Sequence, residues 1–168
     1  VWESGDSLGG TIGWDSDIVA ARSTNGGVAW SAPSPVNSNA ASDSGFDGSP
    51  DVAGDATESC VVVWRSNTDI QGIGADSDIL VTRSSDGGAS WSALAPLNSN
   101  AYTDTANDYA PRLKTDGAGT WFTVWHSFEN LGGMLGNDAD IFMSRSADSG
   151  ASWTTVAALN TNAAADSG

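Results

Sequence analysis

The chain repeats itself with a period of about 62 residues across its length of 168 residues. Trp2, Trp64 and Trp125 are 62 and 61 residues apart, and each is followed by the same elements, Asp-x-Asp-Ile, Arg-Ser and Gly-x-x-Trp. Repeats of this length form one structural unit each, and every unit buries its apolar residues against its neighbours. The chain is therefore restricted to folds that are built from equal, stacked units.

Within one repeat the apolar residues follow the pattern of β-strands. Short runs rich in valine, isoleucine and leucine are separated by glycine, aspartate and asparagine, and no 3.6-residue apolar period lies between them. In the second repeat the expected strands are 49–53, 60–64, 78–83 and 91–97. Four such strands predict a four-stranded antiparallel sheet that needs a neighbour on each face, as the blades of a β-propeller do.

The repeats divide the chain into three such blades. They cover residues of about 1–45, 46–106 and 107–168, and the first repeat lacks the part that includes the innermost strand. We therefore expect an all-β propeller segment of about three blades, which is half of a six-bladed ring. Because its terminal sheets would leave apolar faces uncovered, we expect a homodimer that closes the ring, or a stretch of a longer chain.

The net charge of −15 excludes several classes of partner. An acidic protein repels the phosphates of nucleic acids and of anionic membrane surfaces, so we expect neither as a partner. Cys60 is the single cysteine and cannot form an internal disulfide, and no apolar run is long enough to span a membrane. Calcium, cationic ligands and neutral sugars remain open.

A motif of the form Ser-x-Asp-x-Gly-x-x-Trp occurs once in each repeat, between the expected third and fourth strands. Its defining residues are Ser23, Asn25, Gly27 and Trp30 in the first copy, Ser84, Asp86, Gly88 and Trp91 in the second, and Ser146, Asp148, Gly150 and Trp153 in the third. The motif resembles the Asp-box, or BNR repeat, of sialidase-like β-propellers. The resemblance covers essentially the whole chain, with Asn25 in place of the first aspartate.

The residue types of this motif suit a structural role. The aspartate can accept hydrogen bonds from amides of the turn, glycine supplies the positive φ of the reversal, and tryptophan covers the hairpin. In the family that the chain resembles, the box lies at the periphery of the blade, away from the catalytic mouth. We therefore expect the box residues to stabilise the hairpin rather than to bind a ligand.

Specific function is expected at residues that differ between the repeats. Directly after the recurrent Val-Trp come Glu3, Arg65 and His126, and His126 is the only histidine. Tyr109 is also unmatched, and Arg112 stands on the innermost strand of the third repeat. These five are the candidate ligand-binding residues, and a salt-bridged or solvated structural role is the alternative for each.

The Asp-x-Asp pair before the third strand of each repeat is a candidate metal ligand set. Alternate carboxylates can chelate calcium when further oxygens converge, but the chain contains no twelve-residue calcium loop. We therefore expect these pairs to cap strand ends, with no metal site and no cofactor. Added calcium is then expected to change the stability only slightly.

A sialidase of the family that the chain resembles would need three arginines, a tyrosine activated by a glutamate, and an aspartate as acid and base. Arg22, Arg83 and Arg145 directly precede the boxes and are set aside with them, which leaves only Arg65 and Arg112 for such a mouth, so an enzyme is not favoured. We favour a noncatalytic propeller segment that binds a glycan or a protein, and the resemblance implies an extracellular or cell-surface location. Loop aromatics such as Tyr102 and Phe128 could stack on sugars. The alternatives are a fragment of an exo-sialidase-like glycoside hydrolase and a purely structural repeat of a surface protein.

Overall fold

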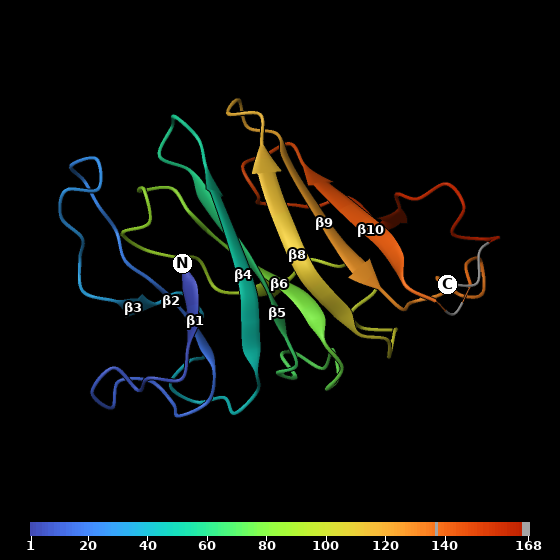
Figure 1. The fold of residues 1–168 in the computed structure, drawn as a ribbon, viewed down its shortest axis with the longest axis horizontal. Coiled ribbons are helices and arrows are strands. Elements are labelled where there is room, and N and C mark those ends of the chain that lie inside the picture. Colours follow the sequence, from blue (N-terminus) through green and yellow to red (C-terminus); the bar gives the residue numbers. More distant parts are fainter. Residues whose placement is uncertain (137, 166–168) are drawn as a thin grey trace.

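The computed structural model describes residues 1–136 and 138–165, and the regular structure in this part consists of β-strands (Figure 1). The first sheet, blade 1, contains β1 (Trp2–Ser4), β2 (Asp17–Ala20) and β3 (Ser34–Pro35). Blade 2 contains β4 (Asp47–Gly54), β5 (Cys60–Ser66), β6 (Asp78–Ser84) and β7 (Ala95–Pro96). Blade 3 contains β8 (Asp108–Thr115), β9 (Trp121–Ser127), β10 (Asp140–Ser146) and β11 (Ala157–Ala158).

Each blade is an antiparallel sheet in which consecutive strands of the chain lie side by side. Blades 2 and 3 have four strands, whereas blade 1 has three and lacks an innermost strand before β1. The sheets follow one another across the molecule (Figure 1). The expected all-β fold of propeller-like blades is confirmed. Within the described residues, no helix has the length and apolar character that a membrane crossing requires.

The outermost strand of a complete blade is shorter than the sequence predicts. The expected strand over 91–97 contains only the two residues of β7. Side chains replace ladder hydrogen bonds beside it: the Ser92 hydroxyl accepts a bond from Arg83 N–H at 3.1 Å, and Thr82 Oγ1 donates to the Ser92 carbonyl at 2.8 Å. Pro96 also has no N–H to donate to a ladder. The segment is therefore extended but only partly paired.

The hydrophobic core lies between the blades, because the second strand of a blade is apolar on both faces. In β5, Val61 and Val63 pack with residues of blade 3, whereas Val62 and Trp64 pack with residues of blade 1. All four side chains are fully buried. Successive residues of a strand point to opposite faces, so a single strand contributes to two interfaces.

The Ser-x-Asp-x-Gly-x-x-Trp segments form turns that are held by their own side chains. Asp148 Oδ2 accepts a hydrogen bond from the Ser152 hydroxyl at 2.5 Å, and its Oδ1 accepts bonds from Ser152 N–H at 2.9 Å and from the Ser146 hydroxyl at 2.7 Å. Because these bonds favour the charged carboxylate, they lower the pKa of Asp148 to about 2. In the first copy Asn25 Oδ1 accepts a bond from Ala29 N–H at 2.9 Å, so an amide oxygen takes the place of the carboxylate.

Both complete blades have a β-bulge near the start of the innermost strand. The pairing of β4 with β5 shifts between Gly48 and Asp51, and β8 shifts at the equivalent place. Ser49 and Ala110, inside the bulges, have φ values of 54° and 51°, which residues with a side chain seldom adopt. A bulge changes the direction of the side chains beside it.

A buried asparagine follows the outermost strand in each of blades 1 and 2. Asn37 Oδ1 accepts a hydrogen bond from Ile18 N–H at 3.0 Å, and its Nδ2 donates to Asp17 Oδ1 at 2.8 Å and to Asp47 Oδ2 at 2.9 Å. Asp17 starts β2 and Asp47 starts β4, so one amide group links blades 1 and 2. Asn98 makes the equivalent two bonds at the start of β6, to Ile79 N–H and Asp78, but, within the described residues, not the bond to the next blade.

Replacement of this asparagine tests its role. Asn37→Ala removes the partners of a buried N–H and of two buried carboxylates, so we expect the free energy of unfolding to fall by about 3 kcal/mol. Ser38→Ala, which changes an exposed residue of the same turn, is the control and should change it by less than about 0.5 kcal/mol. Urea denaturation of both variants measures the difference, and equal stabilities would contradict the proposed link.

Candidate functional site

The residue after the recurrent Val-Trp reaches across to the next blade. Glu3 lies in β1, and its Oε2 accepts a hydrogen bond from Ser49 N–H of blade 2 at 3.1 Å. Arg65, at the equivalent place in β5, has its guanidinium carbon 5.1 Å from the centre of the Tyr109 ring of blade 3. Ser49 and Tyr109 both belong to the bulged segments of innermost strands. At each of these two junctions, the residue after the recurrent Val-Trp therefore contacts the bulged segment of the next blade.

A continuous group of rings surrounds Arg65 at the junction of blades 2 and 3, and we call it the ring cluster. Its members are Phe46, Arg65, Tyr109, His126 and Phe128. The Arg65 guanidinium lies 4.6 Å from the centre of the Phe46 ring. Tyr109 stacks on His126 with ring centres 5.2 Å apart and planes at 27°, and Phe128 meets both rings edge-on at 6.3 Å.

The ring cluster is accessible to solvent. Phe46 is 39% exposed and Phe128 is 47% exposed, while the other three members are half-buried. Flat apolar faces beside hydrogen-bond donors suit a ligand that has one apolar face and polar edges. The ring cluster is therefore the candidate binding site.

The structure brings together part of the set that the sequence singles out. Arg65, Tyr109 and His126 belong to the ring cluster, and Glu3 lies at the neighbouring junction. Arg112 is not a member of the ring cluster: it donates from Nη1 to the carbonyl of the preceding residue at 2.7 Å. The ligand-binding roles of all five remain predictions.

Sequence reasoning missed Phe46. This residue precedes β4, and only the pairing of β4 with β5 brings it to Arg65, 19 residues further along the chain. The available signal is the difference between repeats, because Asn107 stands at the equivalent position before β8. A comparison of every position that flanks an innermost strand would have found it.

Two buried carboxyls flank this region in the sequence. Asp47 follows Phe46, Asp108 precedes Tyr109, and both aspartates are fully buried. Burial disfavours the charged form and raises the pKa of Asp47 to about 7 and that of Asp108 to about 8. Both groups therefore change charge near neutral pH.

Two groups of three aspartates in the described residues have the composition of a metal site. They are Asp15, Asp17 and Asp43, and Asp76, Asp78 and Asp104. In each group, one carboxylate oxygen per residue lies within 4.8 Å of the other two. The structure thus adds Asp43 and Asp104, from the loops between blades, to pairs that the sequence predicts as strand caps.

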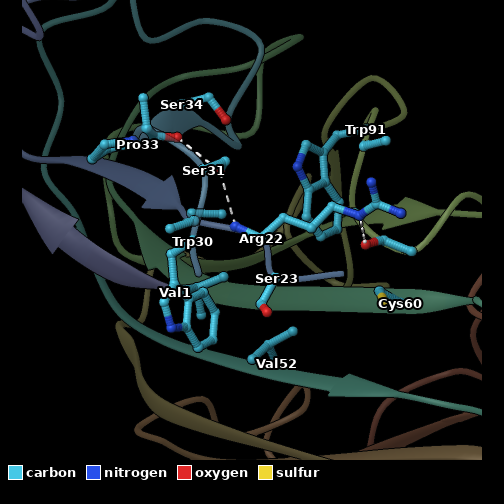
Figure 2. Close-up of a pocket in the computed structure, with 16 residues that line it drawn as sticks. Val1, Arg22, Ser23, Trp30, Ser31, Pro33, Ser34, Val52, Cys60 and Trp91 are labelled. Carbon is cyan, nitrogen blue, oxygen red and sulfur yellow. Dashed lines mark hydrogen bonds between the residues drawn. The ribbon is translucent and has the colours of Figure 1, made fainter. Parts of the chain in front are cut away.

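A cleft of about 720 Å³ lies between blades 1 and 2, lined among others by Trp30 and Trp91 (Figure 2). Arg22 lies in it and donates from Nε to the Gly87 carbonyl at 2.8 Å. Residues 21–23 line the cleft, and their equivalents in blade 2 pair with residues 60–62 of β5. In blade 1 the positions equivalent to 60–62 would stand before Val1, and the cleft lies at that place.

No protein-family model and no curated protein matches the sequence. Solved structures do match. A Hadza microbial sialidase matches with a TM-score of 0.60 and 19% sequence identity over 82% of this chain. A leech intramolecular trans-sialidase matches with a TM-score of 0.53 and 15% sequence identity over 88% of this chain. The α-L-arabinanase of Penicillium chrysogenum matches with a TM-score of 0.55 and 15% sequence identity over 91% of this chain. The chain spans 30%, 20% and 44% of these three structures, respectively.

At these identities the likeness concerns the fold. The three blades have the fold of sialidase-like β-propellers, as the repeated motif indicates. The matched structures are longer than this chain, so the activities in their names belong to complete proteins and are not carried over with the fold.

The buried carboxyls predict a dependence of stability on pH. The pKa values of Asp47 and Asp108 in the folded state lie above the unfolded value near 4, so the folded protein retains protons that the unfolded chain releases. The free energy of unfolding should therefore be highest near pH 4 to 5 and fall as the pH rises toward 8. Each unit by which the folded pKa exceeds the unfolded pKa contributes about 1.4 kcal/mol to this fall. Urea denaturation between pH 4 and 9 in the presence of a chelator measures this decline. Asp108→Asn should make the decline smaller, and a stability that rises over this range would contradict the assignment.

Proposed function

We propose that this chain is a noncatalytic segment of a sialidase-like propeller that binds a glycan at the ring cluster, outside the cell or at its surface. The observation that carries the proposal is the exposed arrangement of aromatic rings around Arg65, at positions where the repeats differ. Phe46 and Phe128 offer faces for the apolar side of a sugar ring. Arg65 and His126 offer donors for its hydroxyl or carboxylate oxygens.

The matched structures support a sugar as the ligand class. The leech enzyme is complexed with 2,7-anhydro-Neu5Ac, and the arabinanase is complexed with arabinobiose. Both ligands are carbohydrates, and the two proteins share the fold of this chain. A protein ligand is the alternative within the same proposal and becomes an outcome of the test.

A fragment of a glycoside hydrolase is the second candidate function, because the matched structures are sugar-active enzymes by name. The ring cluster contains one arginine, Arg65, where a sialidase of this family would use three. Among the described residues, Tyr109 contacts two rings and Arg65 and makes no hydrogen bond to a carboxylate. These contacts favour binding over hydrolysis.

Matched variants test the binding site. A glycan array should identify a ligand, and Arg65→Ala and Tyr109→Ala should each weaken its binding at least tenfold, which corresponds to about 1.4 kcal/mol. Arg83→Ala and Tyr102→Ala replace the same residue types at exposed positions outside the ring cluster and should leave binding unchanged. Titration calorimetry provides the affinities.

The outcomes separate the candidate functions. Turnover of fluorogenic sialoside or arabinofuranoside substrates would favour the hydrolase over the binding module. Loss of binding in Tyr102→Ala with normal binding in Tyr109→Ala would show that the glycan binds at the loops and not at the ring cluster. The absence of any bound glycan would overturn the glycan proposal and leave a protein ligand.

We further propose that the free face of blade 3 receives another blade, from a second copy or from a longer chain. In blade 2, Val61 and Ile79 are fully buried against blade 3. Their equivalents in blade 3, Phe122 and Ile141, are each 41% exposed. The same strand positions thus present apolar side chains that still lack a neighbouring sheet.

Light scattering on the 168-residue chain tests this assembly. We expect a homodimer at micromolar concentration, and Ile141→Asp should shift it to the monomer because the charge would have to be buried. Val28→Asp places the same charge on an exposed hairpin of blade 1 and should leave the dimer intact. A folded monomer of the unmodified chain would contradict the closed dimer.

A further inference from the structure

Three loop and strand segments of blade 1 converge on one group of carboxylates. Asp15 lies before β2, Asp17 is the first residue of β2, and Asp43 lies in the loop from β3 to β4. One carboxylate oxygen of each residue lies within 4.8 Å of the other two. Asp17 is fully buried, and Asp15 and Asp43 are half-buried.

Each of these carboxylates keeps one buried oxygen that has no hydrogen-bond partner. The unpartnered atoms are Oδ2 of Asp15, Oδ2 of Asp17 and Oδ1 of Asp43. The opposite oxygens of Asp17 and Asp43 are held by amides: Asn37 Nδ2 donates to Asp17 Oδ1 at 2.8 Å, and Asn39 Nδ2 donates to Asp43 Oδ2 at 2.6 Å. A buried carboxylate oxygen without a donor is costly, and a cation bound between the three residues would remove this cost.

Blade 2 repeats the arrangement atom for atom. Asp76 Oδ2, Asp78 Oδ2 and Asp104 Oδ1 are the unpartnered buried oxygens of the second group. Asn98 Nδ2 donates to Asp78 Oδ1 at 2.8 Å, and Asn100 Nδ2 donates to Asp104 Oδ2. Asp78 is fully buried, as Asp17 is. The same three oxygens are therefore left free in two independent copies.

We propose that each group binds one Ca²⁺ ion, the first at Asp15, Asp17 and Asp43 and the second at Asp76, Asp78 and Asp104. Ligands on opposite sides of a Ca²⁺ ion are about 5 Å apart, so three oxygens within 4.8 Å can share one ion. Carboxylate oxygens are hard ligands, so a site made only of carboxylates favours Ca²⁺ over the metals that prefer nitrogen or sulfur. This inference departs from the sequence-based expectation of a chain without metal sites.

The glycine two residues before each group leaves room for the first carboxylate. A Cβ on Gly13 would collide with Asp15 Oδ1, and one on Gly74 would lie 2.8 Å from Asp76 Oδ1. The third repeat carries Asp138 and Asp140 at the equivalent positions, with Asp166 as the equivalent of Asp43. Asp166 lies outside the described residues, so the proposal concerns the first two groups.

Electrostatics supports a role for a cation in these groups. Burial, followed by the negative charges of Asp76 and Glu129, raises the pKa of Asp104 to about 6. Burial likewise raises the pKa of Asp78 to about 7 and that of Asp17 above its usual range. A bound divalent cation would offset the repulsion between the three carboxylates and allow all of them to be charged.

Calcium titration of the chelator-treated chain tests the proposal. Calorimetry should detect at least two equivalents of Ca²⁺, and millimolar Ca²⁺ should raise the melting temperature by about 5 °C or more. Asp43→Asn and Asp104→Asn should each remove one equivalent. Asp116→Asn makes the same change of charge on an exposed turn outside both groups and should retain every equivalent.

Three results would overturn the proposal. The first is the absence of both binding heat and thermal shift at millimolar Ca²⁺ in the unmodified chain, which does not depend on the folding of any variant. The second is an unchanged stoichiometry in both Asp43→Asn and Asp104→Asn when circular dichroism shows that they are folded. The third is binding of Mg²⁺ with the same affinity, which would contradict the assignment to calcium.

Discussion

The architecture depends on one strand that is apolar on both of its faces. In β5, Val61 and Val63 face one neighbouring blade and Val62 and Trp64 face the other, and all four are fully buried. A sheet built around such a strand cannot be stable alone, because either face would expose a hydrophobic surface to water. The repeat, the stacked blades and the free face of blade 3 all follow from this arrangement.

The same arrangement explains where the repeats can differ. Residues inside the sheets are fixed by packing, whereas Glu3 and Arg65 stand at the end of the second strand and meet the bulge of the next blade. The ring cluster is therefore assembled from two blades, and neither blade contains it alone. The groups that we assign to Ca²⁺ follow the same logic, because the loop between blades brings Asp43 to Asp15 and Asp17.

The sequence predicts the fold well because the repeat and the alternation of apolar residues are local patterns. It predicts the innermost three strands of blade 2 to within a few residues, but it overestimates the fourth, where hydroxyl groups such as that of Ser92 replace ladder bonds. The site is less predictable, because Phe46 reaches Arg65 only through strand pairing. The buried role of Asn37 is equally hidden, since an asparagine in a turn has the same sequence signature whether or not its amide is buried.

The bulges have a consequence for how such a scaffold can diversify. Ser49 and Ala110 take up a positive φ, and each is followed by a proline. The register shift leaves 49–50 in one blade and 110–111 in the other outside the regular pairing, whereas Gly48 and Tyr109 stay paired with Arg65 and His126. The residue before the bulge therefore stands directly beside the residue after the recurrent Val-Trp: a Cβ on Gly48 would lie 2.7 Å from Glu3 Oε2, and Tyr109 lies against Arg65. A larger side chain at one of these two positions thus needs a matching change at the other, so evolution or a designer has to exchange them as a pair.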